Sequence, residues 1–190
     1  KNISKLRVSL DKLCVESSIK SSELKYFWDK YGVPNRWDNA TTIYIKRMLQ
    51  HALPEENRNF ITQKLFQEYV GISQKELSNE LYMSVSEIRE LVKEGMHVGS
   101  HGSRHYWLNK ITKENQRIDI QDSLEFLEDV GASTKDWVMC YPYGAYNSDT
   151  LSLINSLGAK IGITCEARKA NLDTDNQLTL PRFDTNDFTQ

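Results

Sequence analysis

The chain has 190 residues, of which 39% are hydrophobic and 26% charged, a composition typical of a folded globular protein with a sizeable core. Its net charge of −2 provides no overall field that would attract nucleic acid or an anionic membrane. No apolar run approaches the roughly 20 residues that span a bilayer, and no signal-peptide pattern opens the sequence. We therefore expect no nucleic-acid partner and no membrane span. The three scattered cysteines favour a reducing compartment, so we expect a cytoplasmic rather than an exported protein.

The first 95 residues are predicted to be mostly helical. Residues 2–15 contain apolar side chains without a clear period, so helix and strand both remain open there. Apolar residues at helical spacing then predict four helices, over residues 41–53, 55–70, 73–82 and 84–95. Pro54 ends the first of these four, and Ser84 with Glu87 three residues later forms a capping box at the start of the last.

From residue 96 onward, predicted strands alternate with helices. The strands are expected over residues 96–100, 136–141, 159–164 and 178–183, and the helices over residues 112–130 and 147–158. This alternation predicts an α/β fold with βαβ units and a parallel sheet, either open or closed into a barrel. We therefore divide the chain into a mostly helical region, residues 1–95, and a βα core, residues 96–190.

The most informative stretch runs from Met96 to Leu108 and holds three of the four histidines. His101 and His105 lie four residues apart, just after the strand predicted over residues 96–100. Loops at strand ends often carry the chemistry of α/β proteins, and neutral imidazole is the commonest metal ligand. The pair is therefore a candidate metal site, although such a spacing is also common among ordinary surface histidines.

A family resemblance strengthens this interpretation. Residues 100–105 resemble the second motif of the polysaccharide deacetylase family, the NodB-type carbohydrate esterases, and residues 140–144 resemble its third motif. The approach to the histidines, residues 92–101, is also similar. Residues 180–187 resemble the C-terminal end of the domain in the branch of this family found among surface-polysaccharide biosynthesis proteins. The resemblance covers about residues 40–188.

The resemblance implies a distorted (β/α) barrel of the NodB type and a hydrolase that removes acetyl groups from N-acetylated sugars. It implies one divalent metal ion, typically zinc, held by an Asp and by His101 and His105, which polarises the acetyl carbonyl and activates water. The third motif implies that the backbone N–H of Tyr143 donates to the oxyanion. Read alone, Pro142–Gly144 would be a plain turn. We further expect Tyr141, Pro142 and Trp107 to contact the sugar, with a core or surface role as the alternative.

The first motif of the family, a strand ending in two adjacent aspartates, has no counterpart here, because no Asp-Asp pair occurs in the sequence. Asp11 is followed by Lys12, and Asp38 has no strand before it, so we assign neither to the site. We expect the chain to begin downstream of that motif. It would then lack the first strand of the barrel, and its N-terminal part would be a mostly helical insertion. A catalytic zinc usually has three protein ligands, so we expect this chain alone to be weakly active or inactive.

Two smaller departures concern catalytic support. Many members carry Arg where Cys140 stands, and Arg182 is the candidate that supports the absent Asp base; a surface ion pair with Asp184 is the alternative. No histidine follows His105, so the general acid is unassigned. The weak candidates for that acid are His97, Glu166 and Asp184, and His51 reads as an ordinary helix residue.

Two other functions compete with the enzyme. A degenerate member of the family would bind glycan or a protein partner without catalysis, as the missing aspartates would allow. Residues 74–95 could instead form a helix-turn-helix of a DNA-binding regulator. Five glutamates crowd that segment and would repel phosphate, so this alternative is disfavoured.

Overall fold

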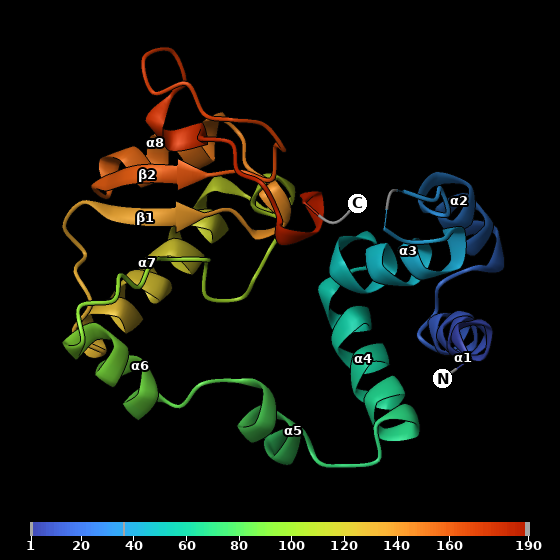
Figure 1. Cartoon of the computed structure of the whole chain (residues 1–190). Coiled ribbons are helices and arrows are strands. Elements are labelled where there is room, and N and C mark those ends of the chain that lie inside the picture. The colour runs from blue at the N-terminus through green and yellow to red at the C-terminus, as the bar shows by residue number, and fades with distance from the viewer. Residues whose placement is uncertain (1, 36, 189–190) are drawn as a thin grey trace. The chain divides into compact units, whose positions relative to one another are not determined.

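A computed structural model describes residues 2–35 and 37–188 (Figure 1). The chain forms two compact units, which divide between Tyr82 and Met83. The sequence places its boundary later, between residues 95 and 96. The difference arises from the helix α6 (Val85–Lys93), because its side chains Ile88 and Val92 pack in a cluster with residues of the second unit.

The first unit is helical, as predicted. Its helices are α1 (Ile3–Glu16), α2 (Ser21–Tyr31), α3 (Ala40–Arg47), α4 (Glu55–Tyr69) and α5 (Gln74–Leu81). The open choice over residues 2–15 is resolved as helix, since the side chain of Asn2 accepts the backbone N–H groups of Ser4 and Lys5 and so caps α1. A π-helical segment, Met48–Ala52, continues α3, and Pro54 precedes α4 as predicted.

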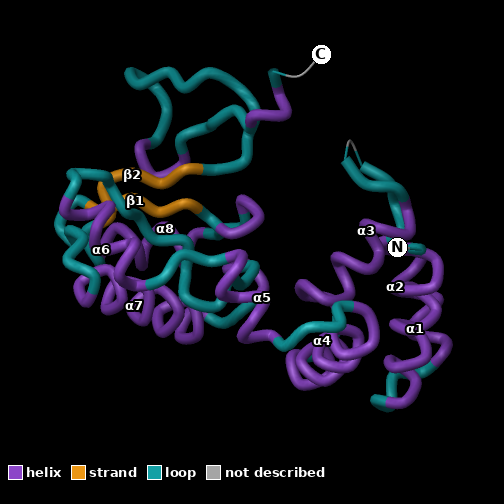
Figure 2. Tube along the Cα trace, turned by 60° about the horizontal axis from the view of Figure 1, so that its bottom comes forward, coloured by secondary structure: helices purple, strands orange, loops and turns teal. Residues whose placement is uncertain are grey.

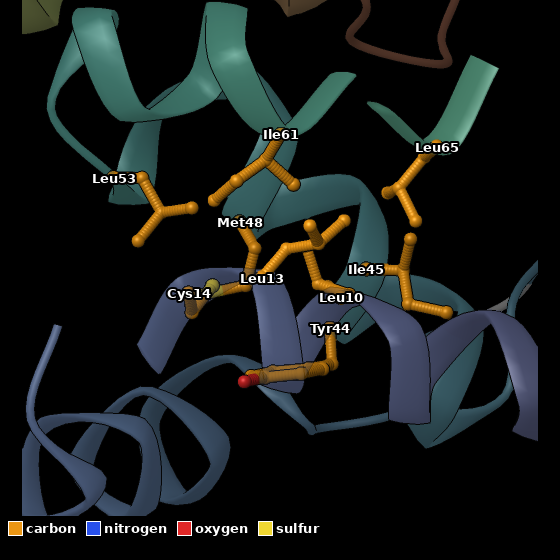
Figure 3. Close-up of a cluster of buried hydrophobic side chains, with 9 residues drawn as sticks. All are labelled: Leu10, Leu13, Cys14, Tyr44, Ile45, Met48, Leu53, Ile61 and Leu65. Atoms are coloured by element: carbon orange, nitrogen blue, oxygen red, sulfur yellow. The ribbon is translucent and has the colours of Figure 1, made fainter. Parts of the chain in front are cut away.

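The core of the first unit is an apolar cluster to which α1, α3 and α4 contribute (Figure 3). Its buried members are Leu10, Leu13, Cys14, Tyr44, Ile45, Met48, Leu53, Ile61 and Leu65. Asp11 borders this core, where it accepts a 2.8 Å hydrogen bond from the Tyr44 hydroxyl and pairs with Arg7 at 3.5 Å. Asp11 therefore has a packing role within the helical unit.

The second unit is a mixed α/β structure, as Figure 2 shows. Its remaining regular elements are α7 (Lys113–Asp129), β1 (Trp137–Cys140), α8 (Ser148–Ser156) and β2 (Ala159–Ile163). The two strands pair in parallel, with Val138 opposite Ile161 and Cys140 opposite Ile163. The predicted parallel pairing of these strands is thus confirmed, and α7 and α8 match the two predicted helices.

Two predicted strands are wrong in extent. Residues 96–100 make only a parallel bridge, at Ser100, to Met139 of β1, while Met96 is exposed. Residues 178–183 likewise make one bridge, at Leu180, to Ile163 of β2, because a 3₁₀ turn occupies Gln177–Thr179 and Pro181 has no N–H to donate. Both segments still lie parallel to the strand that they touch.

The main core of the second unit lies against β1. Alternate side chains of this segment, Trp137, Met139 and Tyr141, are buried with Ile120 of α7 and Leu153 of α8. The carboxyl end of β1 consequently emerges from a packed scaffold and leads directly into residues 141–144. None of the helices in residues 2–35 and 37–188 is long and apolar enough to cross a membrane.

Candidate active site

The structure brings the two predicted metal-ligating histidines together. His101 directly follows Ser100, whose backbone hydrogen-bonds to β1 through Val138 O at 2.8 Å and Cys140 N at 2.9 Å. The imidazole rings of His101 and His105 have centroids 4.7 Å apart and meet edge to face at 64°. Both side chains belong to exposed residues, so the pair is open to solvent and to ligands.

A hydrogen bond fixes the tautomer of His101. Its Nδ1 lies 2.6 Å from the carbonyl oxygen of Cys140, at the end of β1. A carbonyl oxygen only accepts, so in the neutral imidazole Nδ1 carries the hydrogen and Nε2 keeps its lone pair. Metal-binding histidines are commonly oriented in this way by a backbone carbonyl. Cys140 thus contributes to the site through its backbone, whatever its side chain does.

His105 is held in a less common backbone conformation, with φ at 56°. Left-handed conformations are unfavourable for residues other than glycine, although histidine adopts them more often than most. Although the residue as a whole is exposed, partial burial of the ring lowers the pKa of His105. A proton on the neighbouring His101 ring would lower it further, and the carboxyl of Asp119 opposes both effects. The neutral imidazole, which is the form that binds metals, is therefore favoured.

The turn after β1 lies beside the histidines. Tyr143 has φ at 59° and Gly144 has φ at 68°, within a 3₁₀ turn over Pro142–Gly144. The Tyr143 ring lies 4.7 Å from the His105 ring and stacks on Trp107 at 4.9 Å and 21°. The two predicted motifs therefore form one continuous surface, with an aromatic wall formed by Trp107 and Tyr143.

The other predicted site residues are distributed around this surface. The Tyr141 side chain is 1% exposed and its hydroxyl donates to Leu178 O, so the ring faces the core. Pro142 is also buried, so neither side chain is exposed in the way that the expected sugar contact would require. Arg182 is exposed, and its guanidinium lies 3.8 Å from Cys165 Sγ. Cys165 in turn abuts the turn, because a Cβ on Gly144 would lie 3.2 Å from its sulfur.

The two histidines fit part of a metal site. Imidazole nitrogens suit zinc and related ions, and the Cys140 carbonyl prepares one of them. Within residues 2–35 and 37–188, however, no group of three or more His, Cys, Asp or Glu side chains could hold a metal ion. Asp38 pairs with Lys46 at 2.7 Å and Glu166 with Arg168 at 2.8 Å, so both of these carboxylates have other partners.

One residue near the site was not predicted from the sequence. Asp119, on α7, is fully buried, and its Oδ1 accepts the backbone N–H of Arg104 at 2.7 Å, between the two histidines. Burial raises the pKa of Asp119, while the amides of Arg104 and Ser103 act against that rise. The sequence offered one signal for Asp119: a charged residue directly before Ile120, on the side of the predicted helix that was expected to face the core.

Comparison with known proteins shows the family to which the chain belongs. The model of the family described as "Polysaccharide deacetylase" matches residues 55–162, more than half of the chain. YxkH of Bacillus subtilis (strain 168), which is named as a polysaccharide deacetylase, is 25% identical over 99 residues, or 52% of this chain and 35% of YxkH. The Streptococcus pyogenes deacetylase PplD, solved in complex with acetate, is similar with a TM-score of 0.50 and 25% identity. That similarity covers 56% of this chain and 46% of PplD, so the chain spans less than half the length of either relative.

Proposed function

This chain belongs to the polysaccharide deacetylase family, and from that premise we propose that its site serves the hydrolytic N-deacetylation of a sugar. The substrate class would be an N-acetylated sugar of a surface polysaccharide or of its precursor. The observation that carries the proposal is the histidine pair, in which the Cys140 carbonyl leaves Nε2 of His101 with its lone pair beside the ring of His105.

We assign His101 and His105 as ligands of one divalent metal ion, with zinc as the first ion to test. When bound, such an ion supplies Lewis-acid chemistry, polarising a carbonyl and lowering the pKa of water. The edge-to-face contact of the rings and the single tautomer of His101 support this assignment. The lowered pKa of His105 acts in the same direction, because it keeps that imidazole neutral.

We assign the remaining roles to the turn and its surroundings. The backbone N–H of Tyr143 would donate to the oxyanion that develops when water adds to the acetyl carbonyl. The wall formed by Trp107 and Tyr143 would pack against the sugar ring, since aromatic faces are apolar and rigid. Tyr141 and Pro142 would support this surface from the core. Arg182, whose guanidinium lies beside Cys165, would stabilise the Asp base of the family's first motif.

The same proposal extends to the fold. Ser100, β1, β2 and Leu180 lie in parallel order, each bonded to the next, as one arc of a (β/α) barrel of the NodB type would require. The mostly helical region, of which the structure describes residues 2–35 and 37–95, would then be an insertion in that barrel. Because two imidazoles fall short of the three protein ligands usual for a catalytic zinc, we propose that the chain alone turns over weakly.

A second function, glycan binding without catalysis, is favoured by one observation: the described residues supply no third ligand to the histidines. Acetate release separates the two functions. The chain is mixed with N-acetylglucosamine oligomers, with zinc or with a chelator, and the acetate methyl signal is followed by NMR. We expect slow release that requires zinc and is lost in His105→Ala. Binding of the oligomers without any release would favour the binding function, and release that persists in the chelator would contradict the metal assignment.

A further inference from the structure

We infer that Asp119 is a positioning residue that fixes the loop between the two histidines. Its Oδ1 accepts the backbone N–H of Arg104 at 2.7 Å, one residue before His105. Since the bond is made to backbone, it determines the path of the chain rather than the orientation of one side chain. The inference deepens the proposed function, because it rests on the histidines acting as ligands.

A second contact from the same helix holds the other end of this loop. Ser123 lies one turn after Asp119 on α7, and its Oγ is 2.6 Å from the Oγ of Ser100. Residues four apart lie on the same face of a helix. Asp119 and Ser123 therefore bracket residues 101–103 between two buried anchors, and both anchors come from one rigid element.

The loop is shaped to accept this carboxylate. Gly102 has φ at +71°, and a Cβ on it would lie 2.5 Å from Oδ2 of Asp119. Only glycine combines that conformation with such a close approach. The backbone of residue 102 thus packs directly on the acid, which leaves little freedom in the segment that connects His101 to Arg104.

Asp119 is costly to keep as a purely structural residue. It is fully buried, and although the Ser103 amide also favours its charged form, its Oδ2 makes no hydrogen bond within the described residues. A buried carboxylate that is only half satisfied destabilises a core relative to a well-packed apolar side chain. The benefit that offsets this cost is the fixed position of the histidine loop, because the distance between two ligands depends on it.

Hydrogen exchange of the ¹⁵N-labelled chain tests the inference at the bond itself. In Asp119→Ala, the Arg104 amide should exchange at least about tenfold faster, because it loses a charge-assisted partner. The β1 amides, Trp137–Cys140, should keep their rates. Asp119→Asn keeps an acceptor at the same place and should restore most of the protection. The matched control is Asp122→Asn on the same helix. Asp122 pairs with the guanidinium of Arg104 at 2.9 Å and not with its amide, so this change should leave the amide unaffected.

Zinc affinity measured by competition with a chelator provides the functional readout. Asp119→Ala should weaken binding by about 10- to 100-fold, the usual effect of removing a group that orients ligands, and Asp122→Asn should not. The inference is overturned if Arg104 and β1 accelerate equally, or if Asp119→Asn exchanges as fast as Asp119→Ala. A wild-type chain that binds no zinc would contradict the proposed function instead, while the exchange rates would still decide whether Asp119 holds the loop.

Discussion

Replacing Gly102 with alanine should destabilise the second unit more than the same change at Gly131. Both glycines have positive φ, +71° and +81°, so alanine costs about 1–2 kcal/mol at either position through its conformation alone. At Gly131 nothing lies within 4 Å of the new Cβ, whereas at Gly102 the Cβ would lie 2.5 Å from Oδ2 of Asp119. Overpacking a buried contact adds about 1–3 kcal/mol, so the total for Gly102→Ala should be about 2–5 kcal/mol.

The free energy of unfolding of the second unit can be read from native-state exchange of the β1 amides, separately from the helical unit. The excess cost at Gly102 should disappear in an Asp119→Ala background, because the clashing carboxylate is then absent. A double-mutant cycle measures this coupling directly. Equal costs for Gly102→Ala and Gly131→Ala, or a coupling of zero, would refute the placement of Asp119 against the histidine loop.

Three further results are expected. The NMR titration midpoint of His105 should fall below the usual value of about 6.5, because partial burial disfavours its cation. The stability that neutral His105 contributes would be present above pH 6.5, about its unfolded pKa, and lost as the pH falls through the lower, folded pKa. A midpoint at or above 6.5 would contradict this. Alkylation at pH 8 should modify exposed Cys165 quickly and spare Cys14, whose pKa burial raises to about 12; equal rates would be inconsistent with its burial. In urea unfolding, Leu10→Ala should lower the free energy of unfolding by about 2–5 kcal/mol. Val8→Ala, on the exposed side of the same helix, should lower it by less than about 0.5 kcal/mol. Similar losses would contradict the assignment of Leu10 to the core.

The helices from residue 41 onward were predictable because their signals are local, whereas α1 was left open and α2 was not predicted. Ser84 and Glu87 lie three residues apart, and the structure contains the capping box that this spacing predicts. Pro54 and Gly71 likewise mark the two ends of α4 within a residue or two. Strand extent was less predictable, because it depends on partners elsewhere in the chain. Residues 178–183 have a strand-like composition, but a 3₁₀ turn and Pro181 leave a single bridge.

In the candidate site, too, the local features could be predicted from the sequence and the contacts between distant residues could not. The histidine pair and the turn after β1 could be found from short motifs, and the structure places their rings in contact. The bond from His101 to the Cys140 carbonyl spans 39 residues, and the bond from Arg104 to Asp119 spans 15. Residue spacing carries no information about contacts of this kind, since the first arises only when the loop packs on β1 and the second only when it packs on α7.

Zinc titration of the purified chain by calorimetry tests the central claim most directly. The claim predicts weak binding of one zinc ion per chain that is lost in both His101→Ala and His105→Ala. His97→Ala is the matched control, because His97 is exposed in the same stretch and lies outside the proposed pair, and it should bind as the wild type does. Zinc binding that survives both changes, or that His97→Ala abolishes, would contradict the assignment of His101 and His105 as the metal ligands.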